Sequence, residues 1–112
     1  MDIDDIVSAA SILMEEQKKY FGIWEEYFEF IKYRNITRVS EIEHLLDSIL
    51  SMFQTTETLN LYTRVCLYYH AIDKDGAMDY ANFYLEMYDD DSVIKEINKI
   101  ERERKMKKYG KE

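Results

Sequence analysis

The segment that decides the fold is residues 2–34, DIDDIVSAASILMEEQKKYFGIWEEYFEFIKYR. Residues along one face recur at alternating steps of three and four, which is the spacing of an amphipathic α-helix. Asp2, Asp4 and Asp5 at its start suit helix capping and the positive end of the helix dipole. The pattern predicts one long helix, or two helices that divide near Gly22. The face comprises Val7, Ala10, Met14, Gln17, Phe21, Trp24, Phe28 and Ile31, widened by Ile6, Leu13, Tyr20 and Tyr27.

Two more helices are predicted in the middle of the chain. After a turn at residues 35–37, Ser40 and Glu43 have the spacing of a capping box, and apolar residues continue at helical spacing as far as Phe53. The polar residues 54–57 supply a further cap. The helix that follows, residues 58–72, is apolar nearly all round and is therefore expected to be buried.

The last part of the chain has the same character. Residues 73–76 predict a turn, and a fourth helix extends from there to about residue 88. Residues 89–92 end that helix and cap a fifth one, which has a basic end. No strand alternation of useful length is present, so we predict an all-α bundle of five or six helices with a long, aromatic-rich first helix.

Composition agrees with this fold and removes several classes of protein. The chain has 112 residues, no proline, three glycines and one cysteine, which suits one domain of long helices without disulfides. No apolar run is long enough to span a bilayer, and no secretory pattern is present. We expect a single cytoplasmic domain.

Charge is unevenly distributed along the chain. Residues 1–91 carry 19 acidic and 7 basic residues, whereas residues 92–112 carry 4 acidic and 8 basic residues. We interpret the first range as an acidic helical bundle and the second as a basic C-terminal helix or tail of the same domain. Because an acidic surface repels nucleic acid and attracts basic protein surfaces, the expected partner is a host protein with a basic surface, with no direct nucleic-acid or membrane binding.

No catalytic or cofactor-binding pattern is found. The three glycines are far apart, so no glycine-rich phosphate loop is possible. His44 and His70 lack the clustered ligands of a metal site, and Cys66 lies in the most apolar helix, where a thiol is inert. We therefore predict a protein that is not an enzyme and has no cofactor and no metal.

One segment resembles the second half of an EF-hand. In DKDGAMDYANF, residues 73–83, Asp75 and Gly76 correspond to loop positions five and six. The same register places Ala71 and Asn82 where calcium requires carboxylates. A helix turn rich in Asp and Gly explains these residues equally well, so a degenerate EF-hand-like regulatory domain stays an alternative.

A second resemblance is to a phage family. Residues 6–14, IVSAASILM, are similar to the first helix of the AsiA anti-sigma family of T-even-like phages, and residues 84–88, YLEMY, are similar to its C-terminal helix. The resemblance implies an all-helical protein that binds the C-terminal region of a bacterial primary sigma factor. It implies that Ala9, Ile12 and Leu13 make the contact.

The aromatic residues offer further binding surface. There are 16 of them, ten of which are tyrosines, and aromatic residues dominate binding hot spots. Those off the main helical stripes are the better interface candidates, and the acidic run after residue 88 can face a basic partner. A homodimer through the long first helix is an alternative use of the aromatic surface. The candidate partner-binding residues are Ala9, Ile12, Leu13, Phe30, Tyr33, Tyr68, Tyr84, Asp89, Asp90 and Asp91.

The sequence therefore predicts a small acidic protein-binding regulator encoded by a phage or mobile element. Its expected target is a host protein of the transcription apparatus or a nucleic-acid-handling defence enzyme, inhibited by occupation of its nucleic-acid-binding surface. A self-associating structural or assembly protein is the alternative from a different class.

Overall fold

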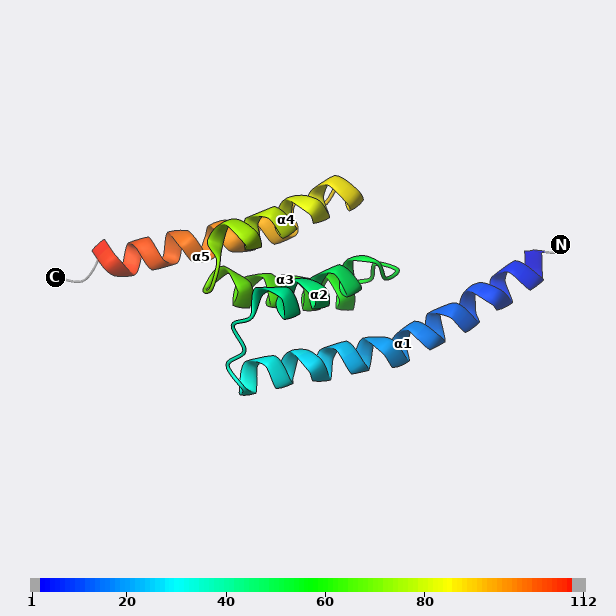
Figure 1. Cartoon of the computed structure of the whole chain (residues 1–112). Helices are drawn as coiled ribbons and strands as arrows, with labels where there is room; N and C mark the ends of the chain where they lie inside the picture. The colour runs from blue at the N-terminus through cyan, green and yellow to red at the C-terminus, as the bar shows by residue number, and fades with distance from the viewer. Residues whose placement is uncertain (1–2, 110–112) are drawn as a thin grey trace. The chain divides into compact units, whose positions relative to one another are not determined.

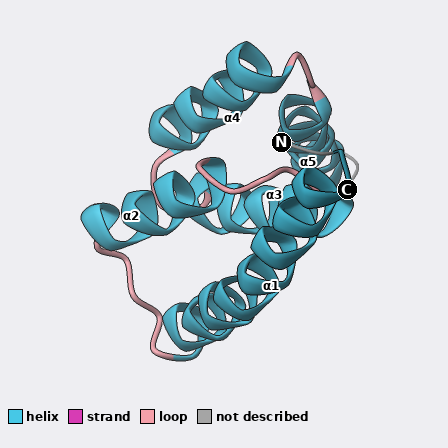
Figure 2. Ribbon diagram, turned by 90° about the vertical axis from the view of Figure 1, so that its right-hand side faces the viewer, coloured by secondary structure: helices cyan, strands magenta, loops and turns pink. Residues whose placement is uncertain are grey.

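The computed structural model describes the backbone of residues 3–109 and the side chains of residues 3–107. Over this range it has five helices and no strand, which confirms the all-α class (Figure 1). Short loops join the helices (Figure 2). The chain divides inside the third helix, between Leu61 and Tyr62, into two compact units. The helices are α1 (Ile3–Tyr33), α2 (Val39–Leu50), α3 (Thr56–His70), α4 (Lys74–Tyr88) and α5 (Ser92–Tyr109).

The helix α1 is continuous through Gly22. Nothing lies within 4 Å of the place where a Cβ at Gly22 would stand, so this glycine does not serve to admit another element. Asp4 and Asp5 lie in the first turn and Lys32 in the last, in agreement with the helix dipole. Asp2, the other expected capping residue, lies outside the described residues. At 31 residues, α1 is about 46 Å long.

A tight turn connects α1 to α2 and lets the two helices pack together. Asn35 adopts the left-handed conformation, with φ of 51°, which asparagine tolerates better than most residues. The amide of Ile36 donates to the carbonyl of Ile31 at 3.0 Å and so closes the end of α1. The buried apolar residues of this first unit are Phe28, Ile31, Ile42, Leu45, Leu46, Ile49 and Leu61.

Both expected ends of α2 need correction. Arg38 is the N-cap and makes no side-chain cap bond, so Ser40 is already helical and cannot form the predicted capping box. The helix ends at Leu50 rather than near Phe53, because the Gln54 side chain donates to carbonyls at the helix end and in the connection that follows. Phe53 is consequently in the connection and 62% exposed.

The predicted cap before α3 is confirmed at Thr55 and Thr58. The Thr58 amide donates to the Thr55 hydroxyl at 3.2 Å, and the Thr55 amide donates to the Thr58 hydroxyl at 2.7 Å. Thr58 is buried, and its hydroxyl also contacts the side chain of Gln54. Each residue therefore satisfies an amide of the other, in the manner of a capping box.

The second unit has a core built largely of tyrosines. The Tyr62 hydroxyl donates to the Tyr80 carbonyl at 2.6 Å, which joins α3 to α4, and the ring of Tyr62 lies 5.0 Å from that of Tyr84. The end of α3 is buried, as its sequence predicts. The buried residues of this unit are Tyr62, Val65, Cys66, Tyr69, His70, Ala77, Tyr80, Ala81, Tyr84, Val93 and Ile97.

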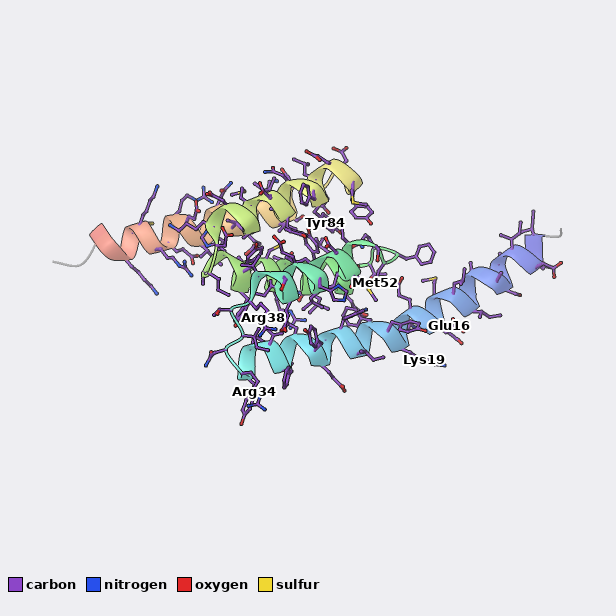
Figure 3. The ribbon with its side chains drawn as sticks, viewed as in Figure 1. Glu16, Lys19, Arg34, Arg38, Met52 and Tyr84 are labelled. Carbon is purple, nitrogen blue, oxygen red and sulfur yellow. The ribbon has the colours of Figure 1, made fainter. Side chains whose placement is uncertain are left out.

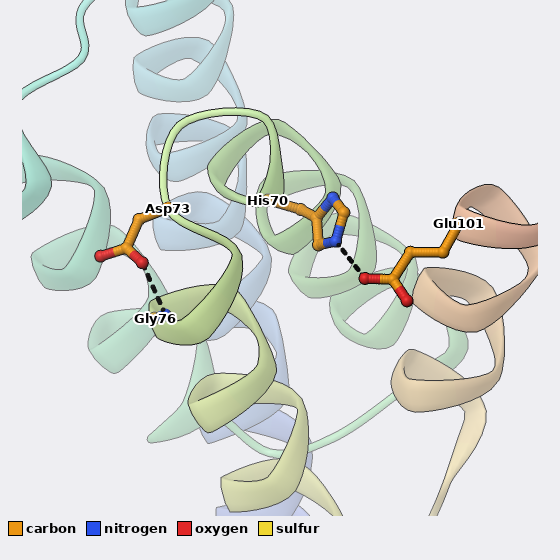
Figure 4. A network of polar contacts seen from close by, with 4 residues as sticks. All are labelled: His70, Asp73, Gly76 and Glu101. Carbon is orange, nitrogen blue, oxygen red and sulfur yellow. Dashed lines mark hydrogen bonds and ion pairs between the residues drawn. The ribbon is translucent and has the colours of Figure 1, made fainter. Parts of the chain in front are cut away.

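The segment that resembles an EF-hand is helical. Asp73 is the N-cap of α4, and its carboxylate accepts from the Gly76 amide at 3.0 Å (Figure 4). Because α4 begins at Lys74, residues 74–82 form a regular helix and not a calcium-binding loop. The EF-hand-like alternative and the turn predicted to extend to Gly76 are both wrong for this reason.

Candidate protein-binding surface

The apolar face of α1 continues into the N-terminal part of the helix, where it is exposed to solvent. Between residues 17 and 31 this face packs toward α2, and Phe28 and Ile31 are almost fully buried. Upstream of residue 17 the same spacing continues, yet every residue from 3 to 16 is exposed. We call the large apolar side chains of this part the N-terminal stripe: Ile3, Ile6, Val7, Leu13 and Met14, each at least half exposed.

This stripe is unusual for a water-facing surface. A helix that packs on nothing normally has polar residues all round, whereas here five large apolar side chains share one side of a helix. Contiguous exposed apolar surface of this kind marks sites of protein interaction. The stripe is therefore the strongest interaction candidate among the described residues.

A pocket of about 370 Å³ adjoins the stripe where α1 meets the end of α2. Gln17 fixes this junction, because its side-chain amide donates to the Phe53 carbonyl at 2.8 Å and accepts from the Phe53 amide at 2.7 Å. Two of the lining residues, Glu16 and Met52, are labelled in Figure 3. The volume is at the lower end of ligand pockets. The lining residues are Leu13, Glu16, Gln17, Tyr20, Trp24, Ser48, Ser51 and Met52.

Three predicted contact residues, Ala9, Ile12 and Leu13, are exposed on the N-terminal part of α1. Phe30 and Tyr33 are exposed too, but they lie at the other end of α1, where Arg34 stacks 5.7 Å from the Phe30 ring. Ile12 and Phe30 are about 27 Å apart along the helix. The structure therefore does not bring these two groups of residues together.

The candidate binding residues Tyr68 and Tyr84, in the second unit, are not exposed. Tyr68 is half-buried. Tyr84 is 2% exposed, so its assignment to a binding surface is wrong: it packs between Tyr62 and Tyr88 in the core. Burial, with Asp90 and Tyr88 nearby, raises the pKa of Tyr84 to about 12.

The acidic residues after α4, Asp89 to Asp91, also stabilise the ends of the neighbouring helices. Asp89 ends α4 in the left-handed conformation, and its amide donates to the carbonyl of Leu85. The Asp90 carboxylate accepts from the amide and the hydroxyl of Ser92 at the start of α5, which lowers the pKa of Asp90. Asp89 and Asp91 remain exposed, so the predicted cap of the fifth helix is confirmed and the acidic surface is limited to these two.

A polar contact of a buried histidine in the second unit has no counterpart in the sequence pattern. His70 is 3% exposed, and its Nε2 lies 2.9 Å from Oε1 of Glu101 (Figure 4). The hydrogen bond from His70 lowers the pKa of Glu101. Since this contact joins the end of α3 to α5, we interpret it as structural. The spacing of 31 residues between the partners leaves no local sequence signal.

The single cysteine of the chain is not a reactive group in this structure. Cys66 is fully buried, and burial raises the pKa of its thiol, which leaves it without nucleophilic character. Among the described residues, no group of three or more His, Cys, Asp or Glu side chains could hold a metal ion. Within the same part of the chain, none of the helices is both long and apolar enough to cross a membrane.

Comparison with models of known protein families, with curated proteins and with solved structures gives no match for this chain. The candidate surface therefore rests on its own geometry. Sequence periodicity located the helix that carries it. What periodicity could not show is that α2 covers only the C-terminal half of that helix.

Proposed function

We propose that this protein is a non-enzymatic regulator that binds another protein through the N-terminal stripe of α1. The observation that carries the proposal is the stripe itself: Ile6, Val7, Leu13 and Met14 are each more than half exposed, although they continue a face that is buried further along the same helix. Covering such a face by a partner removes its apolar area from water.

The charge of the chain indicates the kind of partner. The acidic excess of residues 1–91 favours a partner with basic groups around an apolar docking site. Such surfaces are common on proteins that bind nucleic acid. An inhibitor that occupies one, encoded by a phage or mobile element and directed at the transcription apparatus or a defence enzyme, agrees with these properties.

The resemblance of residues 6–14 to the AsiA family makes one partner the first to test, namely the C-terminal region of a bacterial primary sigma factor. The exposure of Ala9, Ile12 and Leu13 supports this choice. Calorimetric titration of that region with the full chain is expected to show binding that weakens as salt is added, because opposite charges meet across the interface.

The control uses variants that keep the fold. Ile6→Gln and Leu13→Gln remove apolar surface from exposed helical positions, where they leave the protein folded. Each is expected to weaken binding at least tenfold, whereas Met106→Gln, a change at an exposed apolar residue on α5, leaves it unchanged. Equal binding by all variants would rule out the stripe as the contact surface.

Self-association is a second candidate, favoured by the charges at the two ends of the stripe. Asp4 and Asp5 lie at its N-terminal end, and Lys18 and Lys19 follow its C-terminal end. In an antiparallel pair of α1 helices, the acidic end of each copy would lie beside the basic end of the other. Light scattering distinguishes the two candidates: a strictly monomeric mass at high concentration removes this one and leaves the regulator proposal intact.

A further inference from the structure

The pocket beside the stripe has a distinct chemical character. Glu16 is its one formally charged lining residue, and no ion pair joins this carboxylate to another residue that the structure describes. We propose that the pocket binds a basic side chain, arginine in particular, that a protein partner presents. The inference rests on the proposed function, since it specifies the chemistry of a partner bound at the same surface.

Hydrogen bonding in the pocket favours a ligand that donates. The Ser48 hydroxyl already donates to the His44 carbonyl at 2.8 Å, and the Ser51 hydroxyl donates to the Ser48 carbonyl at 2.8 Å. Both hydroxyl oxygens therefore have lone pairs left and no proton to give. With the Glu16 carboxylate they form a set of acceptors, which suits a guanidinium or ammonium group and not a carboxylate or phosphate.

The remaining walls suit the rest of an arginine side chain. Tyr20 and Trp24 supply aromatic rings, and Leu13 and Met52 supply apolar atoms. Aromatic rings attract cations over their faces, and the planar guanidinium also stacks on them. Apolar atoms pack against the methylene groups of a long basic side chain. A pocket of about 370 Å³ has room for one such side chain.

The position of the pocket explains why its ligand would belong to a protein. Leu13 belongs both to the stripe and to the pocket wall. A partner laid along the stripe therefore reaches the pocket directly with a neighbouring side chain. Lys19 of the chain itself is rotated about 60° beyond Glu16, away from the pocket, and Figure 3 shows it on the side of α1 turned away from Met52.

The test needs no identified partner. The probe is N-acetyl-arginine amide, titrated into the full chain, and the matched neutral probe is N-acetyl-citrulline amide, in which the guanidinium is replaced by an uncharged urea of the same shape. Because Trp24 is the only tryptophan, its indole N–H resonance reports on the pocket without ambiguity. We expect a saturable shift with the arginine probe, with Kd on the order of millimolar for so small a ligand, and none with citrulline.

A pair of isosteric variants tests the role of charge. Glu16→Gln is expected to weaken arginine binding about fivefold, the effect of losing a partly exposed ion pair. Glu15→Gln removes the same charge from the adjacent residue, which is rotated about 100° around α1 from Glu16 and does not line the pocket, and is expected to leave Kd unchanged. Tyr20→Ala, which removes a cation–π contact, is expected to weaken binding about threefold.

Three outcomes would overturn the inference. They are an indole resonance that does not shift up to tens of millimolar of probe (about a tenfold excess over the expected Kd), an equal response to citrulline, and an equal loss of affinity in Glu15→Gln and Glu16→Gln. The proposed function fails differently, by retention of partner binding in Ile6→Gln and Leu13→Gln. Since the probe titration requires no protein partner, the two failures are told apart.

Discussion

The two halves of α1 have the same pattern and opposite surroundings. From Gln17 to Ile31, the apolar face lies against α2 and the connection after it, and Phe28 and Ile31 are buried. From Ile3 to Met14, the same spacing faces water. Periodicity therefore shows that a helix has an apolar face, while the length of the neighbouring helix decides how much of that face is covered.

This difference follows from lengths along the chain. α1 has 31 residues, whereas α2 has 12 and spans only about 18 Å. The remaining coverage comes from the connection at Phe53, which Gln17 holds in place. Beyond Gln17 the described part of this unit supplies nothing to cover the stripe, so that part of the helix is available to a partner.

The largest effect is expected from shortening a side chain in the covered half. Phe28→Ala leaves a cavity in the first unit, because Phe28 is 2% exposed, and is expected to lower the free energy of unfolding by about 3–5 kcal/mol. Ile6→Ala changes the bare half, where the expected effect stays within about 0.5 kcal/mol. Urea denaturation of the two variants measures both values. Similar losses in both would mean that the stripe is covered in solution.

Particular residues show how much of the fold could be predicted from the sequence. The apolar spacing of α1 and the apolar surface of α3 fixed the helical class, since both depend on local periodicity. The prediction of a capping box at Ser40 was wrong because α2 begins at Val39, with Arg38 as its N-cap. The assignment of Tyr84 to a binding surface was wrong because Tyr62 of another helix packs against its ring. Residue spacing does not encode this contact.

The candidate site was predictable only in part. Leu13 follows from the first-helix pattern and Ile12 was implied only by the family resemblance. The pocket, however, depends on Met52 and Ser51, which lie beside α1 at the Gln17–Phe53 hydrogen bonds. The sequence pattern placed Phe53 inside a helix, and so it concealed this junction. Similarly, the His70–Glu101 pair requires α5 to lie beside α3.

Gly22 lies within the covered half of α1, and its replacement gives an effect of intermediate size. Gly22→Ala meets nothing within 4 Å and removes the conformational freedom of a helical glycine, so it is expected to raise the free energy of unfolding by about 0.8 kcal/mol. Thermal and urea denaturation measure the change. A loss of stability would mean that α1 bends at Gly22 in solution, which was the alternative that the sequence left open.

The matched control is the same substitution at the other described helical glycine. In Gly76→Ala the new Cβ would collide with the hydroxyl of Tyr69 and approach the Asp73 carboxylate. Because Tyr69 is fully buried and cannot easily move aside, this variant is expected to be less stable than the wild type. The opposite signs of the two changes separate backbone entropy from packing.

The smallest effect concerns Tyr27, where the covered half of α1 meets α2. Burial first, and then the nearby Glu41 that accepts its hydrogen bond, raise the pKa of the Tyr27 hydroxyl above its ordinary value of 10.0. A raised pKa means that the folded state favours the protonated phenol, so its contribution to stability is complete below about pH 10 and is lost as pH rises through the raised pKa. Tyr27→Phe is expected to cost only about 0.5 kcal/mol at neutral pH. The difference from the wild type should shrink above about pH 10.

Tyr33→Phe, at the exposed end of the same helix, is expected to show no such difference. A Tyr27→Phe penalty that stays constant with pH would show that the contact with Glu41 does not couple α1 to α2, and the covered half would then be held by apolar packing and the Gln17–Phe53 junction alone.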